Sequence, residues 1–178
     1  VYIMRNGVEV GTATVVGQNW TFDDSGLAHG TSYTYTAVIK DAAENSGSIS
    51  NTYVINVDTL APTQVVELTR AVDNVDPVSG DIPDGGTTND DTPTLQGTIS
   101  TGLSGTEQVH VFRNGDYIGV ATTTGTNWTY EDASLSNGQT YTYTAKVVDE
   151  AGNASAPSNA ISFTINTEGV NQTTSILS

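Results

Sequence analysis

The sequence predicts an all-β chain made of tandem β-sandwiches, the first of which is incomplete. Three observations support this prediction. Apolar and polar residues alternate with a period of two in several short segments. The pair Asn114–Gly115, a strong signal for a tight hairpin, joins two of these segments. A long stretch near the start of the chain recurs at a constant offset of 108 residues.

The internal repeat sets the expected domain organisation. Residues 1–45 align without a gap with residues 109–153, and the shared positions include Trp20/Trp128 and Tyr33/Tyr141. We predict a first repeat over residues 1–59 that lacks its N-terminal strands, a complete repeat over 60–167, and a linker or the start of another unit over 168–178. Because the chain opens in the middle of this pattern, we expect it to be an excerpt of a longer protein.

The complete repeat contains seven predicted strands. Residues 107–122 supply two of them, around Asn114–Gly115, and residues 139–149 place Tyr141, Tyr143, Ala145 and Val147 on one face. The remaining strands are predicted at 63–72, 92–100, 127–130 and 159–166. Seven short strands in about 100 residues are typical of an immunoglobulin-like sandwich. No apolar period of 3.6 residues extends over a helical length.

Aromatic residues are the predicted core. Leu135, Gly138 and Tyr141 precede and open the penultimate strand, as in the tyrosine corner of immunoglobulin-like domains. The chain contains no Cys, so we expect Trp20 and Trp128 to fill the two cores where a disulfide would otherwise lie. A sugar-stacking surface is the alternative function for these aromatic residues.

The charge of the chain limits its partners. Twenty Asp or Glu residues stand against five Lys or Arg, which gives a net charge of −15 and a pI of about 4.1. Such a chain repels nucleic acid and anionic membrane surfaces, and cations are its natural small partners. No apolar run is long enough to span a membrane. His29 and His110 have no evident nucleophile or zinc partner, so we expect no enzyme activity.

Several motifs in combination resemble a known family. "TNDDTPTLQGTIS", "GTNWTY", "LSNGQTYTYTA" and "DEAGNASAPS" look like the bacterial Ig-like tandem repeats of giant surface adhesins. These adhesins are the biofilm-associated and type I-secreted adhesins of Gram-negative bacteria. The resemblance implies a non-catalytic extender segment at the cell surface, with neighbouring repeats as partners and a host or matrix receptor bound through other domains. The first repeat departs from the pattern, since Glu44 replaces the glycine found at Gly152.

The family also implies structural Ca²⁺ at domain junctions, and Ca²⁺ prefers carboxylate, amide and carbonyl oxygens. At the junction between the two repeats, the linker "VDTLAP" offers Asp58, and the loop between the last two strands of the second repeat offers Asp149 and Asn153. The first predicted calcium site therefore consists of Asp58, Asp149 and Asn153, with help from Asp24.

The second predicted site lies around residues 71–97, which we expect to be the loop between the first two strands of the second repeat. Its two ends carry Asp73, Asp90 and Asp91, and Asp132 lies in a neighbouring loop. A following domain would complete this calcium site. Turn formation is the alternative role for acidic residues here, above all for the mid-loop residues Asp76, Asp81 and Asp84. The spacing does not match an EF-hand.

Two further functions remain open. An Ig-like module could itself bind a glycan or a host protein, and Tyr117 is then the best exposed aromatic candidate, since Glu9 takes its place in the other repeat. The chain could also be an accessory domain of a secreted enzyme.

Overall fold

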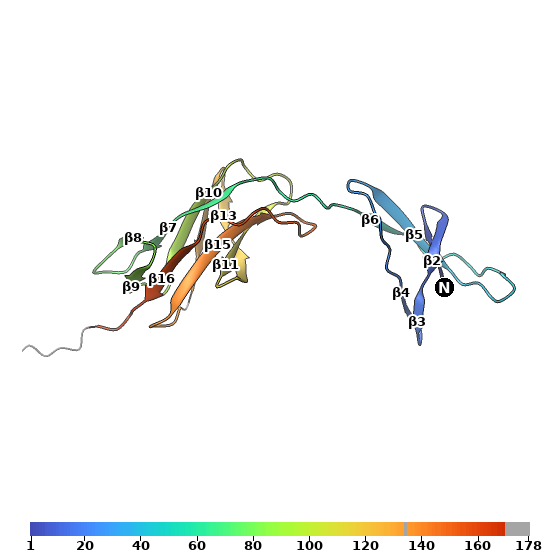
Figure 1. The fold of residues 1–178 in the computed structure, drawn as a ribbon, viewed down its shortest axis with the longest axis horizontal. Coiled ribbons are helices and arrows are strands. Elements are labelled where there is room, and N and C mark those ends of the chain that lie inside the picture. The colour runs from blue at the N-terminus through green and yellow to red at the C-terminus, as the bar shows by residue number, and fades with distance from the viewer. Residues whose placement is uncertain (134, 170–178) are drawn as a thin grey trace, which may run out of the picture. The chain divides into compact units, whose positions relative to one another are not determined.

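A computed structural model describes residues 1–133 and 135–169, and every regular element in them is a β-strand, which confirms the all-β prediction (Figure 1). The chain divides into two compact units, unit 1 (Val1–Leu60) and unit 2 (Ala61–Ser178). Among the described residues, no helix is long and apolar enough to cross a membrane. The predicted linker at 168–178 lies almost entirely outside the described residues.

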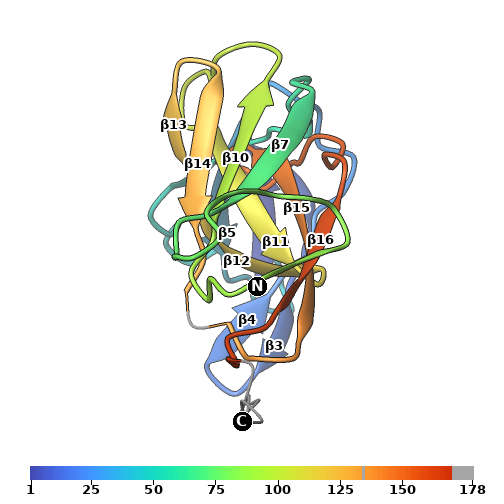
Figure 2. The same cartoon turned by 90° about the vertical axis from the view of Figure 1, so that its left-hand side faces the viewer.

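Unit 2 contains two five-stranded sheets. The first has the order β13-β14-β10-β7-β8, and in Figure 2 β13, β14, β10 and β7 lie side by side. Its strands are β7 (Val66–Asp73), β8 (Gly80–Ile82), β10 (Thr94–Ile99), β13 (Thr122–Thr124) and β14 (Asn127–Glu131). The second has the order β12-β11-β15-β16-β9. Its strands are β9 (Gly86–Thr88), β11 (Gln108–Arg113), β12 (Asp116–Val120), β15 (Thr140–Val148) and β16 (Ile161–Ile165).

The alternation of side chains builds the core of unit 2. Along β15, Tyr143, Ala145 and Val147 are fully buried, while the residues between them are partly exposed. Tyr143 stacks on Phe163 of β16, with ring centroids 5.3 Å apart. Buried residues of both sheets form one cluster, so the two sheets close as a sandwich. Burial of these side chains from water is the main stabilising contribution.

Turn residues fix the hairpins. Asn114 and Gly115 both have positive φ values, 54° and 92°, in the two-residue turn that joins β11 to β12. This backbone matches the twist of the strands, and Asn and Gly tolerate it best. The hairpin predicted at this pair is therefore confirmed. The predicted tyrosine corner is confirmed as well, because the Tyr141 hydroxyl accepts a hydrogen bond from the Ser136 amide at 3.0 Å.

The region predicted as a loop at 71–97 is more ordered than expected. It contains β8, which pairs antiparallel with β7, and β9, which pairs parallel with β16. Each of these strands has only three residues. The sequence signal misses them because three residues are too few to show alternation, and Gly and Pro surround them. Asp81, expected in mid-loop, lies within β8.

Unit 1 reproduces only the later part of this arrangement. It contains a four-stranded sheet of order β2-β1-β5-β6 and a separate hairpin, β3-β4. The strands are β1 (Tyr2–Arg5), β2 (Val8–Thr12), β3 (Thr14–Val16), β4 (Asn19–Thr21), β5 (Ser32–Val38) and β6 (Tyr53–Asn56). At the offset of the repeat, these six strands correspond to β11–β16. None of the strands in unit 1 corresponds to β7–β10.

The two equivalent tryptophans differ in their exposure to solvent because unit 1 lacks some of the strands of unit 2. Trp128 is 1 % exposed and belongs to the core, as predicted, whereas Trp20 is 47 % exposed. The prediction of a buried Trp20 is therefore wrong. The physical reason is that β7, β8 and β10, which complete the sheet of Trp128 in unit 2, have no counterpart in unit 1.

Candidate functional site

An arginine, an aspartate and a tyrosine form a buried group in unit 2. Arg113 Nη1 donates to both carboxylate oxygens of Asp132, at 3.0 and 2.9 Å. The Tyr143 hydroxyl donates to Asp132 Oδ2 at 2.7 Å, and the Ala133 amide donates to Oδ1. Burial, followed by the hydrogen bond to Asp132, raises the pKa of Tyr143 well above its ordinary value. Tyr143 is therefore a neutral hydrogen-bond donor that helps to hold a buried charge.

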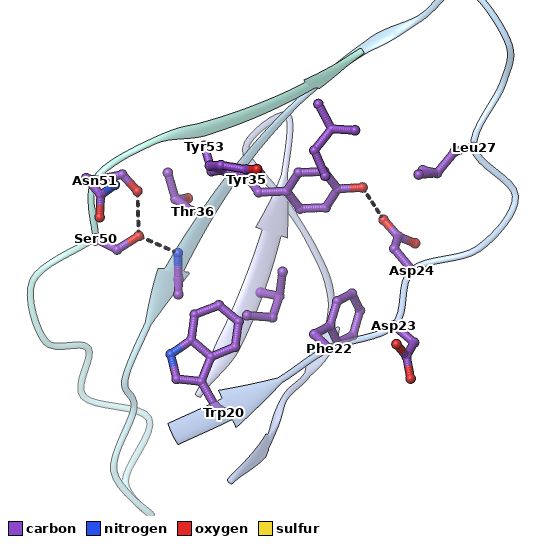
Figure 3. Close-up of a pocket in the computed structure, with 13 residues that line it drawn as sticks. Trp20, Phe22, Asp23, Asp24, Leu27, Tyr35, Thr36, Ser50, Asn51 and Tyr53 are labelled. Atoms are coloured by element: carbon purple, nitrogen blue, oxygen red, sulfur yellow. Dashed lines mark hydrogen bonds between the residues drawn. The ribbon is translucent and has the colours of Figure 1, made fainter. Parts of the chain in front are cut away.

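Unit 1 contains the same group at the offset of the repeat. Arg5 Nη1 lies 3.0 Å from each oxygen of Asp24. The Tyr35 hydroxyl donates to Asp24 at 2.6 Å (Figure 3). The hydrogen bond from Tyr35 is the main reason why the pKa of Asp24 is lowered. Asp24 and Asp132, both predicted as calcium ligands, thus each bind an arginine in this structure. Their calcium role stays a prediction.

The side chain of Asn153 caps Asp149 within one turn. The Asn153 amide donates to Asp149 Oδ1 at 2.8 Å, and its Nδ2 donates to Oδ2 at 2.9 Å. The hydrogen bond from the Asn153 side chain is the main cause of a lowered Asp149 pKa. Asp41 and Asn45 repeat this geometry in unit 1. The structure therefore brings together two of the predicted ligands of the first calcium site.

Asp58, the third of these ligands, lies at the end of unit 1. Its Oδ1 accepts a hydrogen bond from the Leu60 amide at 3.0 Å and lies 3.2 Å from His29 Nδ1. The pair with His29 is an ion pair only when the imidazole is protonated. The side chain of Asp58 is half exposed and so remains accessible to solvent.

Two residues of the second predicted site, Asp73 and Asp90, meet at Thr88. The Thr88 hydroxyl donates to Asp73 Oδ2 and accepts from the Asp90 amide. Asp90 is 0 % exposed, and its carboxylate accepts hydrogen bonds from Asn74 and Thr92. The neighbouring Asp91 is exposed and contributes its backbone carbonyl to Leu135. The ends of the loop thus approach each other as expected.

Acidic residues do not gather into a preformed metal centre within either described range, 1–133 or 135–169. No group of three or more His, Cys, Asp or Glu side chains there could hold a metal ion. Hydrogen-bond donors of the protein instead bind several of the predicted ligand side chains. These hydrogen bonds lower the free-energy cost of burying a carboxylate. Both calcium sites therefore stay predictions.

Unit 1 carries an open apolar pocket of about 550 Å³ that sequence reasoning missed (Figure 3). Trp20, Phe22 and Tyr35 line it, together with Tyr53 and Ile55 of β6. Figure 3 shows the rings of Trp20 and Phe22 on one side and Tyr53 and Tyr35 on the other. The absence of a counterpart to residues 60–108 was the signal that could have revealed it.

Unit 2 carries a second set of aromatic residues on its surface. The rings of His110 and Tyr117 lie 4.8 Å apart, and Phe112 meets Tyr117 edge-on at 6.0 Å. The ammonium of Lys146 lies 5.2 Å from the centre of the Phe112 ring. Tyr117 is 53 % exposed, which agrees with its predicted position. We refer to His110, Phe112, Tyr117 and Lys146 as the β11–β12 aromatic patch.

Comparison with known proteins identifies the domain family of the chain. A family model described as "Bacterial Ig-like domain" matches residues 65–167, more than half of the chain. The chain therefore belongs to the bacterial Ig-like domain family, and the immunoglobulin-like sandwich predicted from the strand pattern is confirmed.

Two curated relatives cover nearly all of the chain. Chitinase A1 of Niallia circulans is 34 % identical over 176 residues, which are 96 % of this chain and 22 % of that protein. Exoglucanase B of Cellulomonas fimi is 29 % identical over 172 residues, which are 97 % of this chain and 14 % of that protein. The chain thus spans less than a quarter of the length of either relative.

A solved structure, the Bacteroides ovatus mixed-linkage glucan utilization locus SGBP-B in complex with a mixed-linkage heptasaccharide, was also found. It is 15 % identical and covers 93 % of this chain and 37 % of that chain, with a TM-score of 0.30. So low a score carries no argument about function.

Proposed function

We propose that the chain is a non-catalytic spacer of a secreted bacterial multidomain protein, in which Ig-like units separate other domains. The observation that carries this proposal is the coverage of the two relatives: nearly the whole chain matches a small part of a much longer protein. Support also comes from the recurrence of one Arg–Asp–Tyr hydrogen-bonded group in both units.

The parent protein is the finer part of the proposal. The names of both relatives are those of polysaccharide-degrading enzymes. We therefore propose an accessory segment of such an enzyme as the better supported context. A biofilm or cell-adhesion protein on the surface of a Gram-negative bacterium, implied by the sequence motifs, is the alternative context. In both contexts the segment lies outside the cell and itself performs no chemistry.

Calcium is a separate proposal for the spacer. Bound between Asp58 and the Asp149–Asn153 turn, or at the Asp73–Asp90 end of unit 2, Ca²⁺ would neutralise acidic ends and restrict bending. Small-angle scattering with and without EDTA tests this mechanism. We expect chelation to change the maximum dimension of the chain, and an unchanged dimension would sink the stiffening role.

Glycan binding is the second candidate function, favoured by the β11–β12 aromatic patch. An exposed tyrosine beside another ring can stack on a sugar, and a nearby lysine can donate hydrogen bonds to hydroxyl groups. Retention of the chain on insoluble chitin and cellulose separates the two functions. The spacer role predicts no retention beyond that of an unrelated acidic protein. Retention that disappears in Tyr117→Ala, but not in the control Val120→Ala on the same strand, would establish the glycan site instead.

A further inference from the structure

The second sheet of unit 2, of order β12-β11-β15-β16-β9, has an outer face that carries almost no charge. We infer that this face, from the β11–β12 aromatic patch across β15 to β16, is a platform for a linear, uncharged polysaccharide chain. The platform rests on the second candidate function, glycan binding, and names its ligand class. It also extends the binding site beyond the aromatic patch, to hydroxyl groups on two neighbouring strands.

Side-chain alternation identifies the residues of this outer face. On β11, β15 and β16, buried residues of the core alternate with residues that retain exposure. The exposed set points away from the core, because successive side chains of a strand point to opposite faces. It consists of His110 and Phe112 on β11, Thr140, Thr142, Thr144 and Lys146 on β15, and Ser162 and Thr164 on β16.

The composition of the outer face differs from that of the rest of the chain. None of the residues just named is acidic, although the chain carries 20 Asp or Glu and a net charge of −15. The outward positions of the first sheet, by contrast, include Glu67, Asp81 and Glu131. So acidic a chain repels anionic polysaccharides. An uncharged ligand therefore matches this face best.

The aromatic patch supplies a surface for the apolar face of a sugar ring. Tyr117 is 53 % exposed, and its ring centre lies 4.8 Å from that of His110 and 6.0 Å from that of Phe112. Burial lowers the pKa of His110, so the imidazole is neutral near pH 7. The ammonium of Lys146 lies over the Phe112 ring and can donate hydrogen bonds to sugar hydroxyls. Rigid rings lose little conformational entropy when a ligand binds.

Two pairs of hydroxyl groups continue the surface along β15 and β16. Thr140 Oγ1 and Thr164 Oγ1 lie 2.8 Å apart, and so do Thr142 Oγ1 and Ser162 Oγ. We refer to these four residues as the hydroxyl row. Each pair uses one hydroxyl hydrogen, so one donor and several acceptor lone pairs remain for a ligand. Sugar hydroxyls both donate and accept, and they match this pattern.

The positions of the patch and the row favour a linear ligand. Phe112 pairs with Thr144 across the two strands. Thr142 lies two residues away from Thr144, which is a step of about 7 Å along β15. Thr142 in turn pairs with Ser162 of β16. Several linked sugars are therefore needed to contact the aromatic patch and the hydroxyl row together.

Unit 1 provides an internal comparison, because its equivalent face differs at both parts. At the offset of the repeat, Glu9 replaces Tyr117 and brings a carboxylate to the aromatic position. Val54 replaces Ser162 and pairs with Thr34, so this pair contains only one hydroxyl group. The combination of an exposed aromatic patch and two hydroxyl pairs is therefore a property of unit 2.

NMR titration of the 178-residue chain with chitohexaose and with cellohexaose tests the platform. These probes are uncharged chains of N-acetylglucosamine and of glucose, so the two titrations distinguish the two sugars. We expect at least one probe to shift signals of both Tyr117 and the hydroxyl row. Tyr117→Ala should weaken this binding strongly, and Thr142→Val should weaken it several-fold, because it removes a hydroxyl group. Hexagalacturonate, a carboxylated chain of the same number of sugars, should not bind.

Thr34→Val is the matched control, because it makes the same change at the equivalent position of unit 1. Binding should stay unchanged in this variant. Thr140→Val repeats the test at the second hydroxyl pair, in case Thr142→Val disturbs β15. The amide signals of β15 show whether each variant keeps the native sheet.

Different results would overturn the platform alone or the glycan-binding function as a whole. Binding that is lost in Tyr117→Ala but unchanged in both Thr142→Val and Thr140→Val would confine the site to the aromatic patch. Equal weakening by Thr34→Val, or equal binding of hexagalacturonate, would also overturn the platform. If neither probe binds and insoluble chitin and cellulose do not retain the chain, glycan binding fails together with the platform, and the spacer function stands.

Discussion

Trp128 and Gly97 lie opposite each other on the adjacent strands β14 and β10, and the indole occupies the space above the glycine. A β-carbon at position 97 would also meet the backbone carbonyl of Glu67 on β7 at far less than 3.0 Å. One residue without a side chain therefore lets a large aromatic ring fill the centre of the sandwich.

Gly97→Ala should destabilise unit 2, because the new methyl group meets a packed ring and a backbone atom that cannot move away cheaply. Overpacking of this kind costs about 1–3 kcal/mol, and occasionally more. Urea unfolding followed by Trp128 emission, in a Trp20→Phe background, measures the change. Gly102→Ala is the control, because its β-carbon would meet only the Gly125 carbonyl, at an ordinary 3.8 Å. Equal stability of the two variants would contradict this prediction.

Tyr143→Phe should lower the stability of unit 2, because a buried carboxylate then loses a hydrogen-bond donor. Hydrogen bonds to charged groups contribute about 1.5–3 kcal/mol. The matched variant Tyr35→Phe should cost less, because the side chain of Asp24 is 16 % exposed and that of Asp132 only 6 %. Urea unfolding of both variants provides the comparison. A larger loss for Tyr35→Phe would show that burial does not set the contribution of this group.

Asn153→Ala should raise the pKa of Asp149 back toward its ordinary value of 3.8, because the Asn153 side chain is the main cause of the lowered pKa. A carboxyl group whose pKa is lowered in the folded state stabilises the fold above the unfolded pKa. That contribution is lost as the pH falls through the folded pKa. The variant should therefore show a weaker loss of stability below about pH 4.

An NMR titration of the Asp149 carboxyl carbon measures this pKa directly. Asn45→Ala is the control, since it acts on Asp41 by the same geometry and should leave Asp149 unchanged. The explanation fails if the Asp149 pKa is the same in the chain and in Asn153→Ala.

Calcium binding should produce a measurable heat in titration calorimetry of the 178-residue chain, if the junction site is correct. Asp58→Ala and Asp149→Ala should each weaken this binding, because each removes an oxygen ligand. The control Asp116→Ala changes an exposed carboxylate outside both predicted sites. If the unaltered chain gives no heat with Ca²⁺, the first calcium site is wrong. If Asp116→Ala weakens binding as much as the other two variants, the binding is non-specific attraction of Ca²⁺ to the acidic chain.

Side-chain alternation predicts most of the complete repeat correctly. β10, β11, β12, β15 and β16 lie within predicted segments, and β7 and β14 each extend one residue past theirs. The pattern fails for β8, β9 and β13, because strands of three residues show no period and depend on their neighbours for pairing. It also fails for Trp20, since the sequence pattern indicates which face a residue occupies but not whether neighbouring strands are present to bury that face.

The acidic residues are harder to interpret from sequence. Turn formation, cation binding and ion pairing use the same carboxylates, and only distances separate these roles. The pairing of Asp132 with Arg113 could have been inferred, because Arg, Asp and Tyr recur together in the two repeats as Arg5, Asp24 and Tyr35. The hydrogen bonds of Asp90 could not have been inferred from the sequence, because they depend on how the two ends of the loop meet at Thr88.

The parallel pairing of β9 with β16 has a mechanical consequence for unit 2. Phe163, Thr164 and Ile165 pair with residues 86–88, and the Asn166 amide extends this ladder to the Thr88 carbonyl at 2.7 Å. A pull that acts on the amino end of β9 and on the carboxyl end of β16 draws these parallel strands in opposite directions along their length. Their hydrogen bonds are then loaded in shear and must break together, instead of opening one after another like a zip.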